Sequence, residues 1–501
     1  MSHEPLLSKV QATTNLCEPA PLHAVMRAEI DKSLRLPLLL LVRTAAFWFL
    51  VGSFLTLLSA LKLVLPSFLD GSSFLTYGRL FPVACDLLIY GWATPIGLAV
   101  SLWLMARLCG TPLRCVRMLV SATLIWNIGI FLGSLAILCG YSTSVELLEY
   151  PQWASFILFV AFLLIGIWTV MLFSARQPRA LYVSQWYLLA ALCSFPWIYA
   201  TANMLLIWGH IEGSAQGPIH WWYAGNLIGL WLTPLALATT YYIIPKITGA
   251  PIYSYYLALL GFFSLLFFEA WSGMSFLIGG PIPAWMASAS VVANILLIIP
   301  MMAVVINFYK MLQGHHQELI QSPALRFVAA GILAYVAVTF LGALNTIPSM
   351  NAIFHFTDYT TGMLLLSLLG FFSMTLFGAV YYIMPRLVDV SWLSTPLIRW
   401  HFWLAVVGIS LMVFSMTMGG LIEGIALEDP AIAFINVLSY AAPWRWLVVC
   451  SWILVCLSGL CFVRLMVMMR WHIIEDLLPS TSAATTTFVS PVLPTSRFIN
   501  E

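Results

Sequence analysis

Residues 151–175 read PQWASFILFVAFLLIGIWTVMLFSA, an apolar run without a charged side chain. Because a helix rises about 1.5 Å per residue, about 20 apolar residues cross the hydrocarbon core of a bilayer. Eleven other runs meet the same criterion, at 44–65, 83–106, 118–139, 181–208, 219–245, 253–279, 284–309, 327–347, 359–385, 400–420 and 446–469. The sequence therefore predicts twelve transmembrane helices in an all-α integral membrane fold.

The composition excludes a soluble globular protein. Of the 501 residues, 62% are hydrophobic and only 8% are charged, whereas soluble domains carry about 25% charged residues. The net charge of +2 argues against a nucleic-acid partner and leaves the lipid bilayer as the expected environment. The nine cysteines lie mostly in apolar runs, where a free thiol behaves as a small hydrophobe. Because no Cys-x-x-Cys-His motif occurs, we expect no covalently attached c-type heme.

The distribution of lysine and arginine predicts the orientation in the membrane. With the N-terminus placed in the cytoplasm, only Lys62, Arg79 and Arg445 of the 21 basic residues fall on the outer side. Cytoplasmic loops carry an excess of basic residues, and a missed or additional span would destroy this alternation. The bias therefore supports twelve spans with both termini in the cytoplasm.

The same pattern predicts the domain organisation. We expect one membrane domain at 44–470 between cytoplasmic tails at 1–43 and 471–501. The first long apolar run begins only near Leu36, after a polar segment, which argues against a cleavable signal peptide. The stretch 479–496 is rich in Ser, Thr and Pro, so part of the C-terminal tail is expected to be disordered.

Few ionisable residues lie at membrane depth, where such residues are candidates for function. Glu269 lies within the seventh run, and Asp86 lies near the outer start of the second. Each is either a proton-handling or polar site, or a structural carboxyl group that is hydrogen-bonded or interfacial. The nine histidines fall in tails, loops and span ends. A buried heme or copper centre usually needs histidine at depth, so the pattern argues against one.

Two spans end in nearly the same sequence. The sixth ends in YYIIPK at 241–246, and the tenth ends in YYIMPR at 381–386. Interfacial tyrosines, a proline and a final cation are typical of a helix end at the cytoplasmic surface. The two segments are therefore either ordinary helix ends or a structural repeat, and they are equivalent in both cases.

Five motifs, spread over nearly the whole chain, match one family in combination. They are GRLFP at 78–82, HWWYAGN at 220–226, YYIIPK at 241–246, PIYSY at 251–255 and NAIFHFTDYTTG at 351–362. Together they resemble subunit I of the heme–copper oxidases, most closely the catalytic subunit of the cbb-type cytochrome c oxidases. The resemblance implies a twelve-helix bundle of that family in the inner membrane of a prokaryote, within respiratory electron transport.

The resemblance also identifies where the chain departs from the family. In the family, six histidines hold two hemes and a copper ion, and a cross-linked tyrosine stands at the position of Glu269. The six histidine positions carry other residues here, namely Ala84, Gly225, Ser275, Phe276, Met363 and Leu365. The flanking frame is retained, at Asn226, Trp271, Gly273, Asp358 and Gly362. We therefore expect neither heme nor copper on this chain.

The resemblance implies partners as well. In the family, subunit I pairs with an anchored c-type cytochrome, so other subunits of a membrane complex are expected here. The outer ends of spans two and ten handle heme propionates in the family. In this chain Arg79, His355 and Asp358 are expected to form a polar cluster or a docking surface at that end.

Three functions remain open from the sequence. The first is a pseudoenzyme that keeps the fold and acts as a non-catalytic scaffold subunit of a respiratory or electron-transfer complex. The second is a transporter of protons, ions or small molecules that uses Glu269. The third is an oxidase subunit with unconventional heme ligation, for which Met363 is the candidate axial ligand. The retained frame around replaced ligands favours the first.

Overall fold

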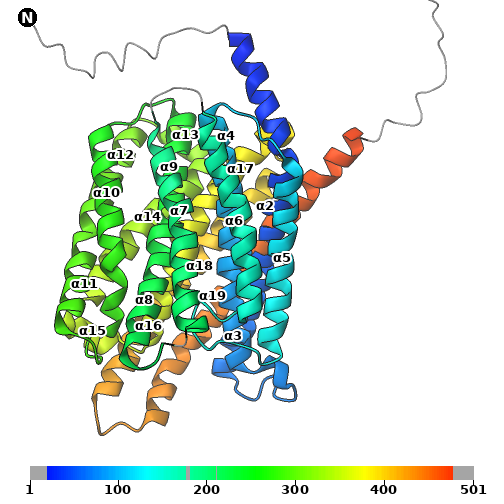
Figure 1. The fold of residues 1–501 in the computed structure, drawn as a ribbon. Helices are drawn as coiled ribbons and strands as arrows, with labels where there is room; N and C mark the ends of the chain where they lie inside the picture. Colours follow the sequence, from blue (N-terminus) through cyan, green and yellow to red (C-terminus); the bar gives the residue numbers. More distant parts are fainter. Residues whose placement is uncertain (1–19, 177–180, 210, 478–501) are drawn as a thin grey trace, which may run out of the picture.

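The computed structural model describes residues 20–176, 181–209 and 211–477, and all regular structure in these ranges is helical. Twelve helices in the described residues are long and apolar enough to cross a membrane, which confirms the predicted number. They pack side by side into one bundle (Figure 1). The predicted all-α membrane architecture is therefore confirmed, whereas its orientation in the membrane stays a prediction.

The spans follow the predicted order along the chain. They comprise α2 (Ala20–Val64); α3 (Tyr77–Asp86), η3 (Leu87–Ala93) and α4 (Thr94–Cys109); α5 (Val116–Leu138); α6 (Gln152–Ser174); α7 (Val183–Ala202) and η4 (Asn203–Trp208); α8 (Gln216–Asn226), η6 (Leu227–Leu232) and α9 (Thr233–Thr248); α10 (Tyr255–Ser272) and η7 (Gly273–Leu277); α11 (Ala284–Leu296) and α12 (Ile298–Leu312); α14 (Pro323–Asn345); α16 (Asp358–Leu365), η8 (Leu366–Ser373) and α17 (Met374–Val388); α18 (Thr395–Glu428); and α19 (Phe434–Leu477). In the part of the chain that the structure describes, four short helices lie between spans, at η2 (Ser73–Leu75), η5 (Gly213–Ala215), α13 (His316–Gln321) and α15 (Pro348–Phe354).

The first and last helices are longer than the apolar runs predicted. The tail expected at 1–43 is helical from Ala20 onward, because α2 continues through Pro37 without interruption. The last helix begins at Phe434 and includes Pro443, whereas the apolar run begins only at 446. It also continues to Leu477, so part of the tail expected at 471–501 is helical. The stretch expected to be disordered, at 479–496, lies outside the described residues.

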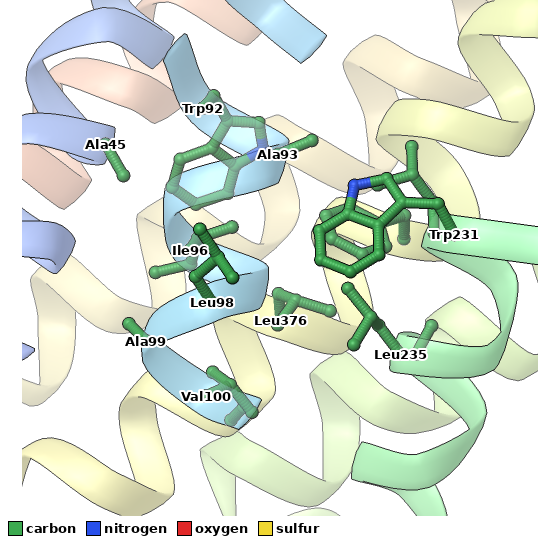
Figure 2. Packing of buried hydrophobic residues seen from close by; sticks show 14 of the residues in the cluster. Ala45, Trp92, Ala93, Ile96, Leu98, Ala99, Val100, Trp231, Leu235 and Leu376 are labelled. Atoms are coloured by element: carbon green, nitrogen blue, oxygen red, sulfur yellow. The ribbon is translucent and has the colours of Figure 1, made fainter. Parts of the chain in front are cut away.

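Spans two, six and ten form the centre of the bundle. The most apolar 18-residue windows of these spans are 100%, 94% and 83% buried, whereas those of the other nine are 33–56% buried. Figure 2 shows Ile96 of span two, Leu235 of span six and Leu376 of span ten around one packed interior. The apolar core therefore lies where the family resemblance places its cofactor-binding helices.

Each of the three central spans contains a π-helical segment, at η3, η6 and η8, and span five contains one as well, at η4. In spans two and six the segment is followed by Pro95 and Pro234, which lack the N–H group that an α-helix needs. In span ten, the hydroxyl group of Ser373 donates instead to the carbonyl oxygen of Leu368 at 2.7 Å. Single π-helical turns often mark functional positions.

The two ends of the bundle differ in shape. Helix α2 begins, and α19 ends, on the upper side in Figure 1. Following the charge-based prediction, we refer to this side as the cytoplasmic end and to the opposite side as the outer end. The hairpin formed by the end of α18 and the start of α19 projects from the outer end (Figure 1).

Candidate functional site

Spans six and seven touch through their backbones. A Cβ atom placed on Gly225 would lie 2.9 Å from the Cα atom and 3.1 Å from the nitrogen of Gly273. A Cβ atom on Gly273 would in turn collide with the carbonyl group of Trp221. Only glycine leaves this space at both positions, so the resemblance-derived copper-ligand position at 225 faces the backbone of span seven directly.

A hydrogen-bond network closes the end of α10 beside this contact. The carbonyl oxygen of Ser272 accepts from the hydroxyl groups of Ser275 at 3.0 Å and Ser290 at 2.7 Å, and from the amide group of Asn294 at 2.8 Å. Asn294 also donates to the hydroxyl oxygen of Ser275 at 3.3 Å. These polar groups come from α10, η7 and α11, and they satisfy the carbonyl that the change of helix geometry at Gly273 leaves free.

The other family ligand positions carry apolar side chains that pack. The ring of Phe276 stacks on that of Trp221, with centroids 4.3 Å apart and planes at 13°. Ala84 in α3 and Leu365 in α16 are buried, while Met363, one turn before the π-helical segment of span ten, is half-buried. The structure thus brings Gly225, Ser275 and Phe276 to the contact between spans six and seven, and it leaves the others on spans two and ten.

The carboxyl group of Glu269 points toward span six. The hydroxyl group of Ser272 donates to its Oε2 atom at 3.0 Å. A Cβ atom on Gly229 would collide with the carboxyl group, so the absence of a side chain at 229 makes room for it. Glu269 therefore lies between α10 and η6 with one hydroxyl donor. Its proposed role in proton or ion handling stays a prediction.

Asp86 faces a second carboxyl group that the sequence did not connect with it. Asp86 is completely buried, and no donor among the described residues reaches either of its oxygen atoms. The buried side chain of Glu149, from the loop after α5, interacts with it. Burial raises the pKa of Glu149 to about 7. Two carboxyl groups in one apolar site favour a state in which at least one is protonated.

Two buried tyrosines fix this loop against the central spans. The hydroxyl groups of Tyr90 in span two and Tyr223 in span six hydrogen-bond to each other. The hydroxyl group of Tyr90 donates to the carbonyl oxygen of Leu147 at 2.5 Å, so the hydroxyl group of Tyr223, 3.3 Å from the same oxygen, is the donor to Tyr90. The loop that carries Glu149 is therefore held in place by both spans, and the carboxyl pair belongs to the core rather than to the surface.

Asp358 belongs to an ionic cluster at the outer end of spans ten, eleven and twelve. Arg445 donates to Asp358 at 3.1 Å and to Glu423 at 3.0 Å. The backbone N–H group of Asp358 donates to the second oxygen of Glu423 at 3.2 Å. Glycines at 420 and 424 let α18 approach closely, since Cβ atoms there would meet the backbones of Tyr359 and Ile353.

Arg79 and His355 have separate surroundings at the same end. Arg79 donates to the carbonyl oxygen of Leu138 at 3.0 Å, so it ties α3 to the end of α5. The ring of His355 contacts that of Phe356, with centroids 3.9 Å apart, and partial burial lowers the pKa of His355. The structure shows no hydrogen bond between Arg79, His355 and Asp358 among the described residues, so the three do not form one cluster.

Cofactor binding can be judged from the donor groups. Among residues 20–176, 181–209 and 211–477, no group of three or more His, Cys, Asp or Glu side chains is arranged to hold a metal ion. The fully buried ring of His401 in α18 forms one hydrogen bond, at 2.6 Å, with the hydroxyl group of Tyr381. The ring of His401 is otherwise surrounded by Phe327, Phe377 and Phe462.

The sequence profile of the cytochrome c and quinol oxidase polypeptide I family matches residues 37–454. This chain belongs to that family. It is 28% identical over 389 residues to a cbb3-type cytochrome c oxidase subunit, CcoN1, of Stutzerimonas stutzeri. The matched region covers 75% of this chain and 81% of that protein. It is 29% identical over 410 residues to cytochrome c oxidase subunit 1 of Rhodobacter capsulatus, with 77% and 75% covered.

The fold of this oxidase-family chain is also found in a solved structure. A heme–copper terminal oxidase dimer determined by cryo-electron microscopy matches it with a TM-score of 0.68, over 92% of this chain and 86% of that one, at 16% identity. The resemblance inferred from the motifs is therefore confirmed at the level of family and fold. The bacterial relatives indicate the inner membrane of a prokaryote as the location.

Sequence reasoning missed the partners of the two outer carboxylates. The motifs and hydropathy give no role to Glu149 or Glu423, and they identify Arg445 only as one of three cations on the outer side. The scarcity of cations on that side was a usable signal, because a lone arginine among several carboxylates is expected to pair with one. The pairing of Glu149 with Asp86 depends on how the loop folds back, which hydropathy does not report.

Proposed function

We propose that this protein is a member of the oxidase subunit I family that holds neither heme nor copper and serves as a non-catalytic scaffold within a respiratory membrane complex. The approach of Gly225 to Gly273 is the observation that carries the proposal. An imidazole ring at 225 needs far more room than the single Cβ atom that already meets backbone at 2.9 Å. Interiors this close-packed do not admit such a group without helix movement.

The remaining donor groups support the same conclusion. Ser275 is engaged by Ser272 and Asn294, and Phe276 stacks on Trp221. Neither supplies the nitrogen or sulfur ligand that copper or heme iron prefers. At the positions that replace the heme ligands, Ala84 and Leu365 carry no ligand atom, and Met363 offers a sulfur without a second protein ligand among the replaced positions. The residues at the replaced positions therefore do not fit the cofactors of the family, and we assign no step of oxygen reduction to this chain.

We propose that the outer end of the bundle is where other subunits bind in the scaffold role. Two of the relatives carry names that describe them as oxidase subunits, and we propose that this chain is likewise one part of an assembly, with an anchored c-type cytochrome as the expected kind of partner. Phe356, beside His355, is 85% exposed at this end. An aromatic ring in that position is typical of a contact with another protein.

Purification of the tagged chain from its native membranes in mild detergent tests this role. We expect the chain to co-purify with other membrane subunits, and a Phe356→Asn variant to lose most of them. Asn tolerates the left-handed backbone at this position (φ 63°), so folding should be unaffected. The control is Ile320→Asn, which alters another strongly exposed apolar residue (71%), in α13. An isolated chain in the wild type, or equal partner yields for both variants, would contradict the scaffold role.

A transporter is the second candidate, and the position of Glu269 between spans six and seven favours it. Proton flux into liposomes containing wild-type or Glu269→Gln protein separates the two. The scaffold proposal predicts equal and negligible flux in both. A flux that the substitution abolishes would replace it with the transporter.

A further inference from the structure

A cavity of about 880 Å³ opens at the cytoplasmic end of the bundle, between α2, α4, α9 and α17. It lies where the three central spans end, and it is remote in sequence from the positions that correspond to the cofactor ligands. Neither the family membership nor the scaffold role assigns a function to it. Its size is in the range of about 300–1,000 Å³ that is usual for small-molecule sites.

The two repeated helix ends meet in this cavity. Tyr242 of YYIIPK and Tyr382 of YYIMPR both line it, with ring centroids 6.3 Å apart and planes at 81°. The ring of Trp103 meets both, at 5.6 Å and 6.2 Å. The final cations of the two segments, Lys246 and Arg386, line the same cavity. The repeat noticed in the sequence therefore builds one aromatic and cationic site from two spans.

The charge around the cavity is strongly positive. Two carboxylates line it, Asp31 and Asp389, and it has six cationic side chains, Arg27, Lys32, Arg35, Arg107, Lys246 and Arg386. The C-terminal ends of α4, α9 and α17 lie here, and each contributes about half a negative charge. These helix ends offset less than half of the excess of four positive charges. A net charge of about +2.5 therefore remains around the cavity.

Several donors in the cavity have no partner. Asp31 is occupied by Arg107 and Trp103, and Arg35 donates to the carbonyl oxygens of Leu387 and Val388. In contrast, no ion pair or hydrogen bond within the described part of the chain involves Arg27, Lys32 or Lys246, nor the hydroxyl groups of Tyr242 and Tyr382. Both tyrosines are more than nine-tenths buried. Arg27, Lys32 and Lys246 are exposed, so these cations and the two hydroxyl groups are available to an anionic ligand in the cavity.

We propose that this cavity binds a phosphate-bearing anion with at least two negative charges. Guanidinium and ammonium groups bind phosphate through strong charge-assisted hydrogen bonds, and the tyrosine hydroxyl groups add neutral donors at the floor. Two sources share this chemistry: the headgroup of an acidic phospholipid and a soluble compound such as pyrophosphate or a nucleotide. The experiment below distinguishes them.

A pair of charge-matched variants makes the test specific. The cavity variant carries Arg27→Gln and Lys246→Gln, which removes two cations without a carboxylate partner in the described structure. The control variant carries Arg114→Gln and Arg117→Gln, which removes two exposed cations at the same end that do not line the cavity. Both variants change the net charge equally, so non-specific attraction falls equally in the two.

The soluble source is tested with the full-length protein in nanodiscs of phosphatidylcholine, titrated calorimetrically with pyrophosphate and with ATP. The lipid source is tested by native mass spectrometry after addition of cardiolipin, whose headgroup carries two phosphate groups and therefore two negative charges. In at least one arm we expect saturable binding that the cavity variant weakens at least about tenfold, which corresponds to about 1.4 kcal/mol, and that the control variant retains. Saturable binding in neither arm, or equal weakening by both variants, would overturn the proposal.

Discussion

Two regions of the bundle accommodate polar groups differently: one is the contact between spans six and seven, and the other is the outer end. At the contact, small residues bring two backbones together, and the carbonyl oxygen of Ser272 receives three hydrogen bonds. At the outer end, Asp86 and Glu149 are buried without a cation, while Asp358 and Glu423 share Arg445. The region where the resemblance places the copper site is thus closely packed, with Glu269 as its one carboxyl group among the residues described above. The outer region contains several charged groups that folding must accommodate.

Gly273→Ala should disrupt the contact between spans six and seven, and we expect it to lower the stability of the protein more than the other substitutions below. The new methyl group collides with the carbonyl group of Trp221 on span six, and overpacking against a rigid backbone costs about 3 kcal/mol or more. We expect little folded protein by size-exclusion chromatography and a lower melting temperature. Gly342→Ala in span nine is the matched control, because its Cβ atom meets nothing within 4 Å. Similar stability of the two variants would show that the spans are not in contact.

Glu149→Gln should reduce the pH dependence of the protein's stability, which tests the buried carboxyl pair at the outer end. Because the folded pKa of about 7 lies above the ordinary value of 4.5, the folded state binds more protons between these values. Stability is then fully present below about pH 4.5 and is lost as the pH rises through 7, by about 3 kcal/mol in total. The charged groups that act on Glu149 are Asp86 and Glu146.

Melting temperatures between pH 5 and 8 check this dependence. The wild type should lose stability toward pH 8, and Glu149→Gln should flatten the curve. Glu146→Gln removes an exposed neighbour in the same loop, and it should keep most of the wild-type slope because burial of Glu149 is the largest cause of its raised pKa. A wild-type curve that rises over this range would contradict the buried carboxyl pair.

Arg445→Gln should have a smaller effect in the same region. It leaves Asp358 and Glu423 close together without their cation, but both carboxylates retain some contact with solvent. The expected loss is about 1–2 kcal/mol, between the values for exposed and buried ion pairs. Raising the salt concentration should recover part of it. Arg117→Gln, with no ion pair among the described residues, should leave the melting temperature unchanged.

The sequence predicted the number of spans because each needs its own apolar run, and hydropathy reports that directly. It placed the starts of the first and last helices too late, since cations such as Arg35 and the proline at 443 interrupt the apolar pattern without ending the helix. The π-helical segments escaped prediction, because one additional residue per turn leaves the composition unchanged. The link between Asp86 and Glu149 also escaped, because it depends on the path of a loop that two tyrosines hold in place.

The cofactor content of the purified chain tests the central claim most directly. The chain should be purified from cells supplied with heme precursor and copper, separated from partner subunits, and examined by its reduced-minus-oxidised absorbance spectrum and by metal analysis. The closed contact between Gly225 and Gly273 predicts no stoichiometric copper. The absence of histidine at Ala84, Met363 and Leu365 predicts no heme bands. A Soret band with an α band that belongs to this chain, or about one copper ion per chain, would contradict the account.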